Sequence, residues 1–403
     1  MTRPASPARA RRAGVAILAL SAVLTAGCTA DAGEPRGHDG DPVAASESPK
    51  PKPAARISAN VDRAKGPVAV DKTLEVKAVD GTLKQVTVRA KDQQVGGRIS
   101  HGGALWRSTD RLEPGLRYQV KAVAVDDKGL RTVRNSSFQT ENLPLDRQTY
   151  PSIAPLQGET VGVGMPVIVK FDVPVADKAS IERHLSVTNT SHQKGAWHWI
   201  SSNEVHWRPV TYWKPGTDVT VKADINSIPA GDGVYGQVSR SATFHVGDSV
   251  ISKVDVAAHQ MKVFINGGLA RTMPISAGKP GFITRSGTKV IIEKIRHKVM
   301  DSETVGIPKG DPEYYKIDVD YAMRVTYSGE FLHAAPWSTG SQGVANVSHG
   351  CVGMTTDNAA WLFNITKRGD VVEVTGSDRH MTLTNGYGDW NESFQEYAAG
   401  SAL

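Results

Sequence analysis

The sequence NVSHGCVGMT, residues 346–355, places one of only two cysteines in a chain of 403 residues directly after a His-Gly pair. Thr355 and Asp357 are typical helix-capping residues, so a helix is expected to begin about four residues after Cys351. A thiol attacks acyl groups as its thiolate, a form that a nearby imidazole or helix N-terminus favours. Gly350 lets the chain bend tightly and brings backbone N–H groups toward whatever the thiol attacks. The stretch therefore predicts either a cysteine nucleophile for acyl transfer or an inert buried thiol.

The N-terminus indicates the compartment in which the two cysteines lie. It begins with four arginines and no acidic residue, followed by an apolar run from Ala13 to Leu24. Such a run, too short to span a bilayer, is typical of an export signal. It ends in LTAGC, which resembles the lipobox of bacterial lipoproteins, where the cysteine is lipidated. We therefore expect residues 1–28 to be a lipoprotein signal with lipidation at Cys28, which leaves Cys351 as the only free thiol.

Composition and charge exclude several other classes of protein. The formal net charge of +6 falls to about +2 without the four signal arginines, so nucleic acid is not an expected partner. The chain has 39 glycines and 22 prolines with 6% aromatic residues, which favours a β-rich protein of two or three domains. It contains neither an H-E-x-x-H motif nor a pair of nearby cysteines. No metal site and no cofactor are therefore expected.

The residues after the signal divide into a linker and two similar domains. Residues 29–56 are proline-rich, charged and poor in apolar residues, which predicts a disordered tether. At roughly 3 Å per residue it could reach about 80 Å from a membrane anchor. Trp-Arg at 106–107 returns at 207–208, and PGxxYxVKA at 114–122 returns as PGxxVxVKA at 215–223, each displaced by 101 residues.

This repeat predicts two tandem immunoglobulin-like sandwiches, at residues 57–145 and 146–248. An alternative role for this region is glycan binding through exposed tryptophans, namely Trp197, Trp199 and Trp213. The pattern WHWI more often places a tryptophan in a sandwich core. Residues 249–376 then alternate apolar and polar positions around Gly-containing turns, which predicts a third β-rich domain. A C-terminal tail follows at residues 377–403.

The motif around Cys351 has a partner upstream. His333 is followed by fourteen residues and then by Ser348-His349-Gly350-Cys351. This pattern resembles the actinobacterial lipoprotein L,D-transpeptidases, in which a YkuD-type catalytic domain follows two immunoglobulin-like domains. The resemblance also includes MDSETVG, YSGEFLHAAPW and KRGDVVEV, and it covers residues 250–376. It implies a mainly β fold, with two tandem sandwiches, a β-rich catalytic domain and a short helix after the catalytic cysteine.

The resemblance also implies roles for individual residues. Cys351 would be the nucleophile and His333 its base, with the carbonyl of Ala334 orienting the imidazole. His349 would belong to the catalytic set and would support the loop with Ser348. The remaining residues would contact substrate, and these are Tyr315, Ser328, Gly329, Ser348, Gly350 and Gly353. Tyr315 and the N–H groups of Gly350 and Cys351 would form the oxyanion hole. Gly353 departs from the family, which usually has Asn or Arg there, and Val305 stands where related enzymes have Tyr in a lid.

The implied reaction joins two peptidoglycan stem peptides, a donor and an acceptor. The thiol would attack the third residue of a tetrapeptide stem, release D-Ala and form a thioester. The side-chain amine of a second stem would then resolve the thioester into a 3→3 cross-link. Two alternatives remain open, an L,D-carboxypeptidase that trims stems and a non-catalytic wall-binding lipoprotein. In each case the protein would lie outside the cytoplasm, bound to the outer face of the cell membrane through its lipid anchor and reaching into the cell wall.

Overall fold

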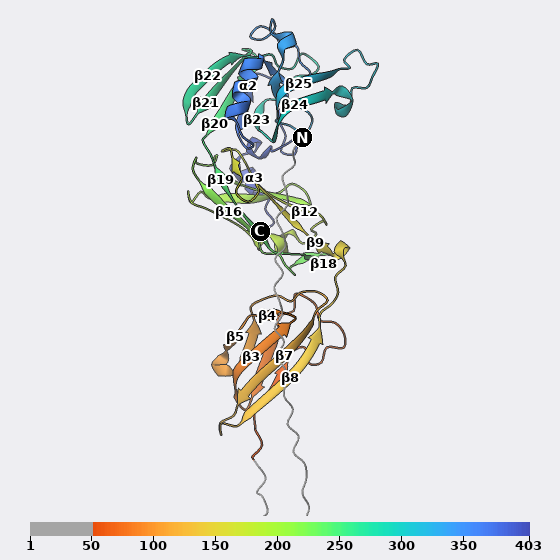
Figure 1. The fold of residues 1–403 in the computed structure, drawn as a ribbon, viewed down its shortest axis with the longest axis vertical. Helices are drawn as coiled ribbons and strands as arrows, with labels where there is room; N and C mark the ends of the chain where they lie inside the picture. The colour runs from red at the N-terminus through yellow and green to blue at the C-terminus, as the bar shows by residue number, and fades with distance from the viewer. Residues whose placement is uncertain (1–50) are drawn as a thin grey trace, which may run out of the picture. The chain divides into compact units, whose positions relative to one another are not determined.

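The computed structural model describes residues 51–403, and the expected signal with Cys28 lies outside them. The described chain is mainly β (Figure 1), as the sequence predicts. Three pairs of sheets follow one another along the sequence, each built around an apolar core. No helix within residues 51–403 is long and apolar enough to span a membrane.

The first pair of sheets is the first immunoglobulin-like sandwich. One sheet has the strand order β1-β2-β6-β5 and the other β4-β3-β7-β8. The strands are β1 (Arg56–Ala59), β2 (Glu75–Val79), β3 (Thr82–Ala90), β4 (Gln93–Val95), β5 (Gly97–Ser100), β6 (Leu105–Ser108), β7 (Arg117–Val125) and β8 (Arg131–Gln139), with a 3-10 turn at His101–Gly103. Trp106 on β6 is buried between the sheets with Tyr118 and Leu112.

The second sandwich repeats this plan. Its sheets have the orders β10-β12-β15-β14 and β11-β19-β16-β13, and a small sheet β17-β18-β9 lies beside them. Its elements are a 3-10 turn at Leu145–Arg147, β9 (Gln148–Thr149), β10 (Pro151–Ala154), β11 (Thr160–Val161), β12 (Val167–Phe171), α1 (Lys178–Glu182), β13 (Leu185–Asn189), β14 (Gly195–Trp199), β15 (Glu204–Pro209), β16 (Asp218–Ala223), β17 (Pro229–Gly231), β18 (Val234–Gly236) and β19 (Arg240–Val246).

The tryptophans of the second sandwich are core residues. Trp197, Trp199 and Trp213 are 9%, 7% and 2% exposed, so the glycan-binding role that required them on the surface is wrong. Trp207 on β15 corresponds to Trp106 on β6, because each lies on a strand next to the edge of its four-stranded sheet. The shared tryptophan is buried at an equivalent place in each core, which accounts for the return of Trp-Arg after 101 residues.

The third pair of sheets forms the domain that contains His333 and Cys351. A five-stranded sheet has the order β22-β21-β20-β28-β23, and a four-stranded sheet has the order β24-β25-β26-β27. The elements are β20 (Val250–Asp255), β21 (Gln260–Ile265), β22 (Gly268–Pro274), β23 (Gly287–Val290), β24 (Glu293–Asp301), β25 (Lys316–Arg324), β26 (Phe331–Ala334), β27 (Val352–Met354), α2 (Thr356–Ile365) and β28 (Val371–Thr375), with 3-10 turns at Ser302–Val305 and Pro336–Ser338. The Thr355 side chain caps α2, the helix expected after Cys351.

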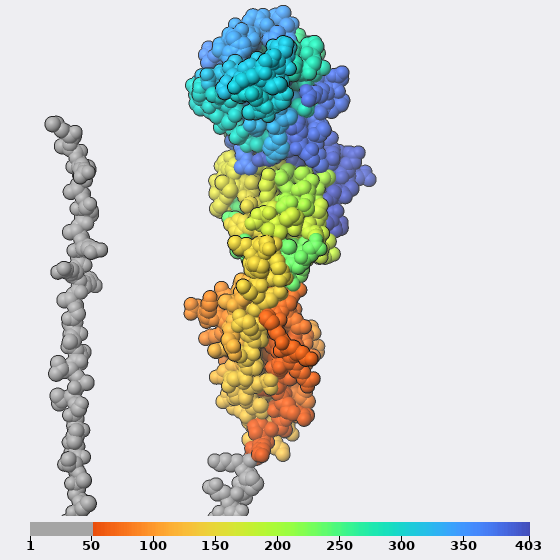
Figure 2. Space-filling view, turned by 90° about the vertical axis from the view of Figure 1, so that its right-hand side faces the viewer, coloured from red at the N-terminus to blue at the C-terminus, as the bar shows by residue number. Residues whose placement is uncertain are grey.

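The C-terminal residues 377–403 are packed against the second sandwich and the third pair of sheets. They contain a 3-10 turn at Asp389–Asn391 and helix α3 (Phe394–Ala398), and the dark blue atoms of the C-terminal residues lie beside the green second sandwich in Figure 2. Asp389 is fully buried and accepts a hydrogen bond from His206 at 2.8 Å and another from the Tyr397 hydroxyl at 3.0 Å. Asn391 bonds both the N–H and the carbonyl of Thr288 on β23. The segment thus fixes strand β23.

Candidate active site

Strand pairing brings the two chemically important segments together. β26 and β27 are parallel neighbours, with His333 opposite Gly353 and Leu332 opposite Val352. Cys351 immediately precedes β27, so this register sets it beside the same strand that carries His333. Both side chains line one pocket of about 240 Å³, whose wall also includes Tyr315, Trp337 and His349. This pocket is the candidate active site.

The imidazole of His333 is held as a neutral base. The ring is 5% exposed, and burial lowers the pKa of His333 below its usual value. Its Nδ1 lies 2.7 Å from the carbonyl oxygen of Ala334, and a carbonyl can only accept, so Nδ1 carries the proton. Nε2 therefore keeps its lone pair for proton transfer. The indole of Trp337 stacks on the ring at 6.0 Å between centroids.

Cys351 is a protonated thiol in this conformation. The residue is 8% exposed, and burial raises the pKa of its thiol to about 11. Its Sγ lies 3.7 Å from the carbonyl oxygen of Gly329, to which the S–H donates. The sulfur packs in an apolar cluster with Met300 and Phe331. The thiol consequently needs a base to ionise it during the reaction rather than standing as a thiolate beforehand.

The loop before Cys351 is fixed by two hydroxyl groups. Ser348 Oγ donates to the Cys351 carbonyl at 2.6 Å and accepts from the Gly350 N–H at 3.1 Å. Thr284 Oγ1 donates to the Gly350 carbonyl at 2.9 Å and accepts from the Gly278 N–H at 2.8 Å. Gly350 has φ of +118°, in the region that favours glycine, which explains why this position carries no side chain.

These bonds define which backbone donor is available to an oxyanion. The Gly350 N–H, assigned to the oxyanion hole by resemblance, is already engaged by Ser348 in this conformation. Within residues 51–403, no hydrogen bond uses the Cys351 N–H. In a trans peptide the N–H points opposite to the carbonyl, so the Thr284 bond to the Gly350 carbonyl fixes the direction of the Cys351 N–H. That group is therefore a preorganised donor.

Tyr315 supplies a second possible donor at the pocket. Burial raises the pKa of its phenol to about 12, with a smaller effect from the Cys351 charge, so the hydroxyl stays protonated. Its ring lies 4.8 Å from the ring of His349 between centroids. Tyr315 is the last residue of the lid, the segment 302–315 between β24 and β25. The phenol can donate only while this segment covers the pocket.

His349 lies at the pocket wall but is bonded away from the thiol. Its Nε2 lies 2.7 Å from Glu313 Oε2, and the same oxygen accepts from Lys279 Nζ at 2.5 Å. These contacts lower the pKa of Glu313, with the Lys279 bond contributing most. Phe282 packs edge-on against the imidazole. His349 therefore connects the catalytic loop to the lid, a contact that supports geometry rather than proton transfer.

Ser328 and Gly329 lie in the turn between β25 and β26. The Ser328 hydroxyl accepts from Asn385 Nδ2 at 2.9 Å, and the Ser328 N–H donates to Asn385 Oδ1 at 2.9 Å. Gly329 has φ of +98°, and a Cβ there would lie 2.7 Å from Cγ1 of Val305 in the lid. The turn is therefore tied to the C-terminal segment on one side and covered by the lid on the other.

Gly353 contributes backbone bonds and no side chain. Its N–H donates to the Ser276 carbonyl at 2.8 Å, and its carbonyl accepts from the Ser276 N–H at 2.9 Å. A Cβ at this position would come within 2.9 Å of the Cβ of Ala335. A side chain here would therefore require Ala335 to shift, and glycine leaves this part of the pocket wall open.

Several residues of the site carry no recognisable motif in the sequence. Thr284, Glu313, Lys279 and the buried Glu330 belong to this group, and a fifth is Lys289, only 1% exposed. Each has an ordinary sequence context and comes to the site through tertiary contacts. Among residues 51–403, no three His, Cys, Asp or Glu side chains gather as metal ligands.

Comparisons with known proteins agree with this geometry. Residues 65–229 match the bacterial Ig domain family, and residues 249–374 match the L,D-transpeptidase catalytic domain family. L,D-transpeptidase 2 of Mycobacterium tuberculosis is 36% identical over 404 residues, which is 98% of this chain and 96% of that protein. L,D-transpeptidase 1 of the same species is 41% identical over 264 residues, covering 65% of this chain and 98% of that protein.

A solved structure of an L,D-transpeptidase in complex with imipenem is similar as well. It has a TM-score of 0.50 and 39% sequence identity, and the match covers 57% of this chain and 99% of that one. The similarity to L,D-transpeptidase 2 extends over nearly the full length of both chains and therefore includes the sandwiches as well as the catalytic domain. On this extent of shared sequence, the chain belongs to the L,D-transpeptidase family.

Proposed function

We propose that this protein forms 3→3 cross-links in peptidoglycan by transferring a stem peptide through a thioester on Cys351. The observation that carries the proposal is the pairing of a protonated thiol with a neutral, oriented imidazole in one pocket. That pair provides a nucleophile and a general base, which are the two groups acyl transfer requires.

The first half of the reaction forms the thioester. His333 Nε2 takes the proton of the Cys351 thiol while Sγ attacks the carbonyl carbon of the third residue of a tetrapeptide stem. The carbonyl oxygen becomes an oxyanion, which accepts from the Cys351 N–H and from the Tyr315 hydroxyl. The C–N bond to D-Ala then breaks, and the proton on His333 passes to the leaving amine.

The second half of the reaction consumes the thioester. The side-chain amine of a second stem attacks the thioester carbon, and His333 Nε2 takes a proton from that amine. The C–S bond breaks, and the proton returns from the imidazole to Sγ. The newly formed peptide bond links the two stems. The enzyme returns to its starting state, with a Cys351 thiol and a neutral His333.

No nucleotide is required for this sequence of steps. The thioester conserves the energy of the peptide bond that was cleaved, so exchanging one peptide bond for another changes the free energy little. Such a reaction suits a compartment without nucleotides, and the N-terminal arginines, apolar run and LTAGC sequence support export with lipidation at Cys28. The anchored protein would act on the wall outside the membrane. Detergent phase partitioning of the wild type and Cys28→Ala tests the anchor, because only the wild type should enter the detergent phase.

A single incubation distinguishes the transferase from its alternatives. The purified protein is mixed with a disaccharide tetrapeptide, and the products are separated and weighed by mass spectrometry. Dimers linked between third residues support the proposal. Tripeptides without dimers would identify an L,D-carboxypeptidase, and an unchanged substrate would favour a non-catalytic wall-binding lipoprotein.

A further inference from the structure

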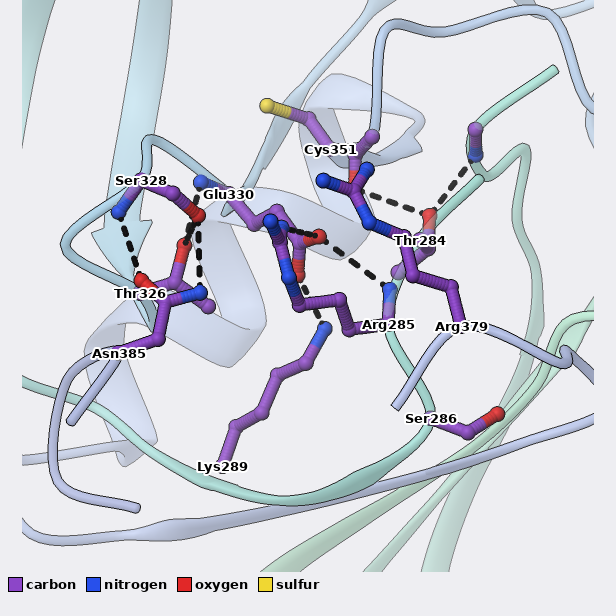
Figure 3. A network of polar contacts seen from close by, with 12 residues as sticks. Thr284, Arg285, Ser286, Lys289, Thr326, Ser328, Glu330, Cys351, Arg379 and Asn385 are labelled. Atoms are coloured by element: carbon purple, nitrogen blue, oxygen red, sulfur yellow. Dashed lines mark hydrogen bonds and ion pairs between the residues drawn. The ribbon is translucent and has the colours of Figure 1, made fainter. Parts of the chain in front are cut away.

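A compact group of charges is buried directly behind the catalytic loop. Lys289 on β23 is 1% exposed, and its Nζ lies 2.5 Å from Glu330 Oε2. Arg285 Nη1 lies 2.8 Å from Glu330 Oε1, and the Arg285 backbone N–H donates to the same oxygen at 3.2 Å. Glu330 is 4% exposed. The cluster of Arg285, Lys289 and Glu330 (Figure 3) therefore holds a buried Lys–Glu ion pair and a second cation whose side chain is 16% exposed.

Two members of this cluster, Glu330 and Arg285, adjoin contacts that hold the nucleophile. Glu330 directly follows Gly329, whose carbonyl accepts from the Cys351 thiol at 3.7 Å. Arg285 directly follows Thr284, whose hydroxyl bonds the Gly350 carbonyl. A Cβ placed on Gly350 would lie 3.6 Å from Cγ of Glu330, so the carboxylate side chain is stacked under the catalytic loop. In the view of Figure 3 the Glu330 side chain lies between Cys351 and Lys289, and the sulfur points away from the cluster.

The burial of these charges is poorly explained by stability alone. Removing ions from water costs several kcal/mol for each ion, which their mutual attraction repays only with good geometry. Apolar residues of similar volume usually stabilise a fold at least as well as a buried ion pair. A buried carboxylate stacked under the loop that carries the reactive thiol is therefore better explained by an effect on that thiol.

We propose that Glu330, held by Lys289 and Arg285, is a positioning residue for the nucleophile, which fixes the Gly329 carbonyl against the Cys351 thiol and places a negative charge behind that thiol. The proposal rests on Cys351 being the nucleophile of the proposed function. It goes further by assigning roles to three residues that contact neither substrate nor reacting atoms. The resting enzyme would thereby stay poorly reactive toward oxidants and electrophiles outside the cell until a bound stem engages His333.

The charges around the thiol act in opposite directions. The ionisable groups that face it from its neighbouring elements are Glu330, Lys289, Arg324 on β25, Tyr315 and His333. Beyond the effect of burial, Glu330 raises the pKa of the thiol, whereas Lys289 and Arg324 lower it. Removal of Glu330 and removal of Lys289 should therefore shift the thiol in opposite directions, which loss of packing alone would not do.

The test measures the rate at which iodoacetamide alkylates Cys351 in the full chain at pH 8. In this reaction Sγ bonds to the acetamide carbon, iodide leaves, and the thiol proton goes to buffer. Peptide mass spectrometry assigns the label to Cys351. A shift of about one unit in the thiol pKa changes the rate roughly three- to tenfold, because the lower basicity of a more acidic thiolate partly offsets its greater abundance.

Glu330→Gln is expected to accelerate alkylation within that range, and Lys289→Met is expected to slow it. Arg285→Gln should slow it as well, and since its side chain is 16% exposed this variant keeps the test open if Lys289→Met fails to fold. All three should lower kcat for cross-linking about tenfold with little change in KM, since the nucleophile is displaced and the substrate contacts remain.

Glu182→Gln is the matched control, because Glu182 is 3% exposed and hydrogen bonded in the second sandwich.

The control should lower the melting temperature and leave the alkylation rate unchanged. If Glu330→Gln and the lysine or arginine variant change the rate in the same direction, or neither changes it, the proposal is overturned. Alkylation reports on the thiol whether or not the protein cross-links stems. A failure of the proposed transferase function would therefore appear as absent dimers with the wild type and stay distinguishable from a failure of this inference.

Discussion

The two sides of the catalytic loop differ in charge. In front of it, the pocket holds a protonated Cys351, a neutral His333 and a protonated Tyr315. Behind it, Lys289 and Glu330 form a buried ion pair. The residues in the pocket become charged only during the reaction, when a proton moves from sulfur to imidazole. Lys289 and Glu330 behind the loop are charged throughout and do not contact the substrate. Substitutions of the pocket residues should therefore abolish or strongly slow chemical steps, and substitutions behind the loop should change the rates of those steps by smaller factors.

The largest expected effect comes from the nucleophile. Cys351→Ser should abolish cross-linking, because a hydroxyl is far less acidic than a thiol and the neutral imidazole of His333 cannot ionise it without a further relay. The fold should survive, since the two side chains differ by one atom. Mass spectrometry of dimers provides the activity measurement, and a carbapenem provides a second readout at the same atom.

The intact wild-type protein should gain the mass of one carbapenem, because a thiolate opens the strained lactam to give a stable acyl adduct. An equal mass gain in Cys351→Ser would show that the acylated group is elsewhere. Retained cross-linking in that variant would contradict the assignment of the nucleophile.

Removal of the base ranks second. His333→Ala should lower kcat/KM by roughly a hundredfold or more, the usual loss for a general base. The residual rate should rise with pH, since hydroxide then ionises the thiol directly, whose pKa is about 11. Kinetics over a range of pH would check this. A variant within tenfold of the wild type at neutral pH would show that another group removes the proton.

The acid limb of the pH profile follows from the same imidazole. Burial lowers the pKa of His333, so the neutral base persists to a pH below the ordinary histidine value of about 6.5 and is lost only as pH falls through the lowered value. Activity should therefore stay high at pH 6.5 and fall about tenfold per unit below the lowered pKa. A half-maximal point above 6.5 would mean that His333 is not the titrating base.

The sequence predicts the pocket residues in front of the catalytic loop far better than the buried charges behind it. His333 and Cys351 lie in one short segment whose ends are joined by the parallel pairing of β26 and β27, so their spacing already reflects their contact. Lys289 and Glu330 are 41 residues apart and look like solvated surface charges in the chain. Only the packing of β23 behind the turn before β26 reveals that they are buried together.

The same limit applies to the fold. Alternation and the 101-residue repeat predict both sandwiches, because each core is filled by residues a few positions apart along a strand. The packing of the C-terminal segment is not predictable in this way. Asp389 reaches His206 over 183 residues, and an acid and an imidazole so far apart carry no shared pattern. The residues expected as a tail consequently include two of the most deeply buried polar side chains, Asp389 and Tyr397.

The next prediction concerns the boundary between the two sides. Thr284→Val should lower kcat roughly tenfold or more with KM little changed, because the Gly350 carbonyl loses its donor and the Cys351 N–H loses its fixed direction toward the oxyanion. Thr284→Ser keeps the hydroxyl and should retain most of the activity. Steady-state kinetics of both variants would check this, and equal losses in the two would show that the methyl group, not the hydroxyl, is what matters.

The smallest expected effect concerns the lid. His349 Nε2 and Lys279 Nζ share one oxygen of Glu313, so Glu313→Gln weakens this contact between lid and loop without touching the thiol. Tyr315 then covers the pocket less often, and cross-linking should fall only a few-fold, mainly through kcat, because the phenol donates to the oxyanion rather than to the ground state.

His349→Ala should lower the cross-linking rate about tenfold, since it also removes the packing against Tyr315 and Phe282. The double variant should lose no more than His349→Ala alone, because both changes break one contact. Additive losses would mean that His349 acts independently of the lid and would place it with His333 among the groups that serve the chemical step.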